Sequence, residues 1–158
     1  MSEPINPEDF TQAMYFLLDE TFESVHGIFL DKGTSLFETL TTISAEEASI
    51  PVGGKCATLA AQVKHVAFYL EVTIESVKNP DFPPADWDEI WRNTGAVTSE
   101  EWEKIQNALR NSYTRTRELV QETKAWDDPY KIGGAIGVVV HSAYHLGEIR
   151  QALCTLKN

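Results

Sequence analysis

Cysteine is scarce in this sequence, and the scarcity excludes a small protein held together by disulfides. The 158 residues include two cysteines, Cys56 and Cys154, which lie far apart and form no C-x-x-C motif. Both fall in segments with helical character, where isolated cysteines usually pack as small apolar side chains. We therefore expect both cysteines to be buried, reduced and without a part in catalysis.

Basic residues are also in short supply. The chain carries 13 Lys and Arg residues against 24 Asp and Glu residues, which gives a net charge of −11 at pH 7. Because an acidic surface repels phosphate groups, this balance argues against nucleic acid or an anionic membrane as a partner. A small-molecule substrate is compatible with it.

Long apolar runs are missing as well. No stretch approaches the roughly 18 apolar residues that indicate a membrane-spanning helix. Residues 1–9, with the sequence MSEPINPED, contain neither the basic region nor the apolar region of a secretory signal peptide. We therefore expect a cytoplasmic location.

What the sequence does contain is a succession of helix signals. Apolar residues recur at helical spacing in four segments, at about 7–26, 55–78, 98–123 and 132–156. Capping patterns precede the first and third segments, and no segment alternates in the manner of a strand. The prediction is all-α: a single four-helix-bundle domain over residues 1–158, with a long Pro-rich loop at 79–97 between its second and third helices.

The expected fourth helix carries the most informative motif, His141-x-x-x-His145. Residues four apart lie one above the other on a helix face, so both imidazoles can point at one metal ion. Glu148 falls on the same flank. The alternative interpretation is a pair of surface or capping histidines, because a short pattern also arises by chance. The core face of this helix is expected to consist of Ile136, Val139, Val140, Ala143, Leu146, Ile149 and Leu153.

A third metal ligand must come from elsewhere in the chain, which offers His26 and, in the expected second helix, His65. The position of His65 is a difficulty, because it lies roughly 150° from the middle of the apolar stripe at about 100° per residue. Ala61, Phe68 and Val72 make the histidine side half apolar, and a helix in a bundle contacts two neighbours. His65 is therefore either a buried ligand or a partly exposed histidine beside Tyr69.

Together these residues resemble the DinB/YfiT-like superfamily of metal-binding four-helix bundles. In length and helix order the resemblance covers nearly the whole chain, and its specific motif residues are His65, His141, His145, Gly147 and Ile149. It implies a metal ion held by the three histidines. Relatives of this bundle include bacterial S-transferases that use low-molecular-weight thiols, a thiol-dependent isomerase and metal-dependent hydrolases.

The chain departs from the family pattern at Glu148, where relatives usually carry glutamine. One interpretation gives this carboxylate a catalytic role, as a general base or as a group that orients a ligand or a water. The other makes it an exposed helical glutamate paired with Arg150 or Lys157.

Three neutral imidazoles suit a divalent ion such as Zn²⁺, Ni²⁺ or Fe²⁺, and three protein ligands leave a coordination position open. We therefore expect a metal-dependent enzyme that activates a thiol or a water against a small-molecule substrate. The resemblance favours an S-transferase with a low-molecular-weight thiol over a hydrolase. The alternative is a non-catalytic helical binding or dimerisation module with a structural or vestigial metal. A homodimer is expected as the commonest oligomer.

Three further residues have no assigned role at this stage. His26 follows Glu23 as E-x-x-H, but no second E-x-x-H occurs, which argues against a di-iron carboxylate centre. Trp87 and Trp91, in the Pro-rich connection, share one side of a short helical turn. They either plug the end of the bundle or form a pocket wall.

Overall fold

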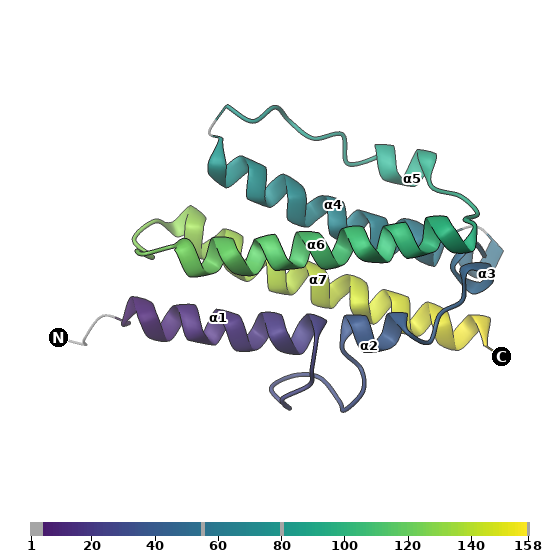
Figure 1. The fold of residues 1–158 in the computed structure, drawn as a ribbon, viewed down its shortest axis with the longest axis horizontal. Helices are drawn as coiled ribbons and strands as arrows, with labels where there is room; N and C mark the ends of the chain where they lie inside the picture. The colour runs from purple at the N-terminus through teal and green to yellow at the C-terminus, as the bar shows by residue number, and fades with distance from the viewer. Residues whose placement is uncertain (1–4, 55, 80, 158) are drawn as a thin grey trace.

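The computed structural model describes residues 5–54, 56–79 and 81–157. These residues form seven α-helices and one short 3-10 helix, and none of them lies in a β-strand. The all-α prediction is therefore confirmed. Four of the helices are long and lie side by side (Figure 1): α1 (Pro7–Phe22), α4 (Leu59–Lys78), α6 (Ser99–Glu122) and α7 (Pro129–Leu156).

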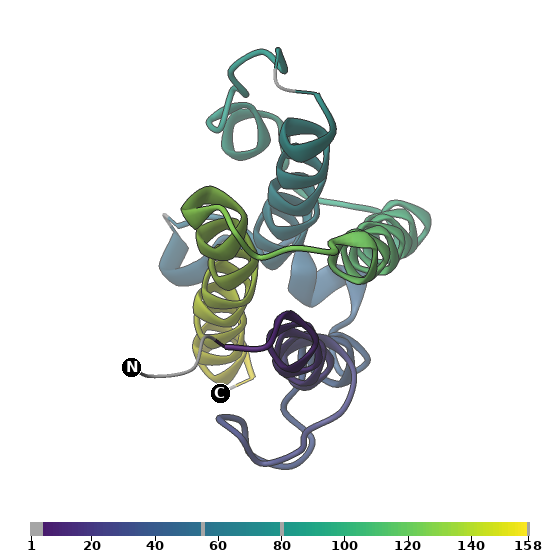
Figure 2. The ribbon, with the colours of Figure 1, turned by 90° about the vertical axis from the view of Figure 1, so that its left-hand side faces the viewer.

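The four long helices share one apolar core. Both α1 and α4 contact α6 and α7, so each long helix packs on two others (Figure 2). The rings of Phe22 and Tyr113 stack with 4.6 Å between centroids, which joins α1 to α6. The largest fully buried apolar side chains on the long helices are Met14, Leu18, Phe22, Leu59, Leu70, Ile74, Leu109, Leu146 and Ile149.

Shorter helices lie in the connections. The chain between α1 and α4 forms α2 (Leu36–Leu40), α3 (Ala45–Ala48) and the 3-10 helix η1 (Val52–Gly54). Trp102 Nε1 donates a hydrogen bond of 3.0 Å to the carbonyl oxygen of Ile43, which attaches this segment to α6. The connection between α4 and α6 contains α5 (Glu89–Asn93). Pro80, in the expected Pro-rich loop, lies outside the described residues.

Helix starts follow the capping side chains more closely than the apolar pattern. Thr98 and Glu101 form the expected capping box of α6. However, α4 begins at Leu59, because the hydroxyl of Thr58 accepts the backbone N–H of Ala61 at 3.1 Å and caps the helix there. Lys55, the expected first residue, lies outside the described residues.

The expectation of buried cysteines is wrong. Cys56 precedes α4 and is exposed, and Cys154 is exposed on the last turns of α7. Cys56 loses the expected burial because the cap at Thr58 starts the helix after it. Cys154 is apolar enough for a core position, but α7 turns other side chains, including Ile149, towards the neighbouring helices.

The buried face of α7 also differs from the expectation. Val138 is buried, whereas Ile136 is 46% exposed and Val140 is 61% exposed. Because apolar residues occupy nearly every side of this helix, its periodicity does not select one face. Although α7 is 28 residues long, neither it nor any other described helix combines the length and apolar character needed to cross a membrane.

α1 ends at Phe22 rather than near Gly27, and a buried carboxylate accounts for the early end. Glu20 has no solvent exposure, and its oxygens accept four backbone N–H groups at 2.7–3.1 Å. Burial raises the pKa of Glu20, but these hydrogen bonds outweigh it and lower the pKa to about 2. The loop folds back over the carboxylate through Gly27, at φ 80°. The N–H donors belong to His26, Ile28, Phe29 and Leu30.

Replacing Glu20 with Gln should destabilise the fold by about 3 kcal/mol, because the amide removes the charge and turns a donor towards N–H donors. Chemical denaturation measures the loss. Glu23→Gln, an exposed neighbour just after α1, is the matched control and should change stability by less than about 0.5 kcal/mol. Equal stability of the two variants would contradict a structural role for the buried carboxylate.

Candidate metal centre

The three histidines selected from the sequence meet between α4 and α7. One nitrogen atom from each of His65, His141 and His145 lies within 4.8 Å of the other two. Their ring centroids are 4.5–5.2 Å apart. In the part of the chain that the structure describes, the group consists of these three side chains. The i, i+4 spacing on α7 supplies two of them, and α4 supplies the third.

His65 is buried despite its position away from the apolar stripe of α4. It is 7% exposed, because α4 packs on α6 and α7 and is also contacted by α5. The ring of Trp91, on α5, lies 4.5 Å from the His65 ring between centroids. The interpretation of His65 as a partly exposed residue is therefore wrong. His145 is similarly buried, and His141 is half-buried.

Two of the imidazoles have a buried nitrogen without a hydrogen bond. Among the described residues, neither His65 Nδ1 nor His141 Nε2 has a hydrogen-bond partner. A buried polar atom left in this way costs about 1–3 kcal/mol, and native proteins rarely leave one unexplained. Two such atoms in one cluster fit a group that binds both of them, and a metal ion is such a group.

His145 is held by two neighbouring side chains. Its Nδ1 lies 2.7 Å from Gln62 Oε1 and 2.9 Å from Glu148 Oε2. Because a carboxylate can only accept, Nδ1 carries the hydrogen, and the lone pair of Nε2 is available to a metal. Glu148 thus pairs with His145 rather than with Arg150 or Lys157. Gln62 was not among the residues expected from the sequence, although its place three residues before His65 puts it on the same face of α4.

The electrostatics of the cluster favour neutral rings. Burial lowers the pKa of His65 and of His141 to about 4, and repulsion from the His145 imidazole adds to the effect. Burial also lowers the pKa of His145, although the Glu148 carboxylate opposes this. At neutral pH all three rings are therefore uncharged, as metal ligands must be.

Aromatic side chains surround the histidines. Tyr69 stacks on His141, with 3.7 Å between ring centroids and 14° between planes. Gly137 permits this approach, because a Cβ atom there would lie 3.2 Å from the Tyr69 hydroxyl oxygen. Trp87 lies 6.3 Å from the His65 ring between centroids and is 41% exposed. Trp87 and Trp91 thus both lie beside the His65 ring.

An open pocket of about 510 Å³ lies beside the two partners of His145, although none of the three histidines lines it. Gln62 and Glu148, the two partners of His145, line it together with Cys56, Tyr144 and Gly147. The volume suits a small organic molecule. His26 lies elsewhere, where its Nε2 is 2.6 Å from Asp19 Oδ2, and it does not join the cluster.

Comparisons with models of protein families, with curated proteins and with solved structures found no match for this chain. Its chemistry is therefore inferred from the cluster itself. Three close, neutral imidazoles, one of them oriented by a carboxylate, form a donor set that suits a divalent ion.

We expect metal-free protein to lose stability as the pH falls from about 6.5 towards 4. In this range His65 and His141 are protonated in the unfolded chain but stay neutral in the folded protein, because burial lowers their pKa to about 4. Each histidine protonated only in the unfolded chain lowers the free energy of unfolding by up to about 1.4 kcal/mol per pH unit. Denaturation curves across this range measure the slope. His65→Leu should flatten it; constant stability across the range would refute the buried neutral rings.

Proposed function

We propose that this chain is a DinB/YfiT-like four-helix bundle that binds one divalent metal ion on His65, His141 and His145 and uses it in catalysis. The observation that carries the proposal is the pair of buried imidazole nitrogens without hydrogen bonds, His65 Nδ1 and His141 Nε2, beside a third ring with a fixed tautomer. The mutual contacts of α1, α4, α6 and α7 support the bundle.

The donor set suits Zn²⁺, Ni²⁺ or Fe²⁺. When bound by three protein ligands, such an ion acts as a Lewis acid that lowers the pKa of a thiol or a water at its open position. We infer transfer of a low-molecular-weight thiol to a small electrophile, with hydrolysis as the second reaction type; the family resemblance supports this order. A cytoplasmic homodimer is part of the same proposal.

The residues around the histidines have separate tasks in this proposal. Gln62 and Glu148 hold the His145 ring in one orientation through its Nδ1–H group. Trp91 and Tyr69 exclude water from the rings that they cover, which keeps the imidazoles neutral. Glu148 acts first as a positioning residue, because one of its oxygens is already bonded to His145.

Metal analysis of protein purified without a histidine tag tests the proposal. After incubation with Zn²⁺, Ni²⁺ or Fe²⁺ we expect about one ion per chain, and loss of that ion in His65→Ala. His26→Ala is the matched control and should keep the ion, since His26 lies outside the cluster. Absence of metal from the unmodified protein, or its retention by a folded His65→Ala variant, would overturn the site.

The metal-loaded protein then serves for activity screens with thiols and electrophiles and, without thiol, with esters and amides. His145→Ala is the inactive reference. If neither reaction is found and a fourth protein ligand occupies the open coordination position of the metal, the chain is a non-catalytic module with a structural ion.

Glu148→Ala should weaken metal binding about 10- to 100-fold, because the His145 ring loses one of the two acceptors that orient it. Glu148→Gln keeps an oxygen acceptor and should lose less affinity. Competition with a chelator measures both variants. If Glu148 only positions His145, saturating metal restores full turnover to Glu148→Ala. Unchanged affinity with lost turnover would instead make Glu148 a general base.

A further inference from the structure

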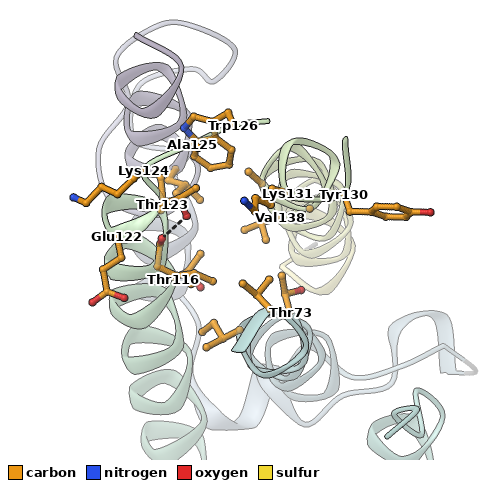
Figure 3. Close-up of a pocket in the computed structure, with 17 residues that line it drawn as sticks. Thr73, Thr116, Glu122, Thr123, Lys124, Ala125, Trp126, Tyr130, Lys131 and Val138 are labelled. Carbon is orange, nitrogen blue, oxygen red and sulfur yellow. Dashed lines mark hydrogen bonds between the residues drawn. The ribbon is translucent and has the colours of Figure 1, made fainter. Parts of the chain in front are cut away.

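A second cavity lies at the end of the long helices where α6 connects to α7 (Figure 3). Its volume is about 380 Å³, and all four long helices contribute to its wall. Each long helix contributes an apolar side chain: Leu18 from α1, Ile74 from α4, Val120 from α6 and Val138 from α7. None of the three clustered histidines lines it, so it is separate from the candidate metal centre.

The polar side chains of the wall have already used their hydrogen-bond donors. The hydroxyls of Thr73, Thr116 and Thr123 each donate to a carbonyl oxygen of their own helix, at 2.8–2.9 Å. Trp126 Nε1 donates to Thr11 Oγ1 at 2.8 Å. With these donors engaged, the threonine methyl groups and the indole ring make the wall apolar in effect.

The charged side chains at the rim of the cavity either point away from it or are paired with another side chain. Figure 3 shows Glu122 and Lys124 directed away from the cavity, and Tyr130 likewise. Lys131 is paired with Asp127, at 3.0 Å between Nζ and Oδ1. A carboxylate on a ligand would therefore have to displace Asp127 from Lys131 to gain a counter-charge, and Glu122, the acidic residue of the wall, is directed away from the cavity.

The volume sets the size of a ligand. An apolar cavity of about 150 Å³ holds a six-carbon ring. In proportion, the cavity of about 380 Å³ between the long helices holds about 15 non-hydrogen atoms. Unfilled apolar volume destabilises a fold, whereas an apolar guest restores the lost contacts. We propose that this cavity is a binding site for a neutral, apolar small molecule of that size, such as a fused-ring hydrocarbon or a short alkyl chain.

Fluorescence titration with aminoanthracene, a neutral fused-ring amine of about this size, tests the proposal. We expect saturable binding of one probe per chain, with decanol competing at least tenfold better than decanoate. Ala135→Phe and Val138→Phe place a ring in the cavity and should each weaken probe binding at least tenfold. Val140→Phe, on the exposed face of the same helix, is the matched control and should bind as the unmodified protein does.

Energy transfer from Trp126 to the bound probe locates the probe independently of the filled variants. Trp126→Phe should remove most of the transfer per bound probe, with the bound fraction measured by direct excitation of the probe, and this test stands even if a filled variant fails to fold. His65→Ala should bind the probe normally, which separates this site from the metal centre. Absence of saturable binding, full binding by a folded Val138→Phe variant, or transfer unaffected in Trp126→Phe would each overturn the proposal.

Discussion

Removal of three imidazoles from water, where α4 packs against α7, is the constraint on which the candidate centre depends. Burial lowers the pKa of His65 and His141 to about 4, so both rings stay neutral and keep their lone pairs. The same burial leaves a nitrogen of each ring without a hydrogen bond. Only His145 is compensated by the protein itself, through Gln62 and Glu148. A metal ion bound to the cluster would give the unpartnered nitrogens of His65 and His141 a partner.

The same helices build a second environment with the opposite chemistry. Around the histidines, polar atoms are buried and lack partners; around the cavity near Trp126, the polar side chains are already bonded to the protein. The first arrangement suits a ligand that accepts lone pairs, and the second suits one that offers only apolar surface. Long helices can carry both, because each turn presents a new set of side chains to the neighbouring helices.

Local signals predicted the helices well, and long-range packing decided what they bury. The capping box at Thr98 marks the start of α6 in both the sequence and the structure, since it depends on residues four positions apart or fewer. The face of α7 was mispredicted at Ile136 and Val140, because its apolar residues surround the helix. The end of α1 was misplaced because Glu20 binds a loop that no local pattern reveals.

The sequence by itself determined that His141 and His145 share a face, because four residues make about one turn of any α-helix. It also indicated His65 as the third member, through a family resemblance. Only the tertiary structure decided that His65 is buried beside that pair and that Gln62 supports His145, since both facts require α4 to meet α7 at one particular rotation. Such a rotation is set by side-chain packing between segments far apart in the chain, which helical periodicity does not encode.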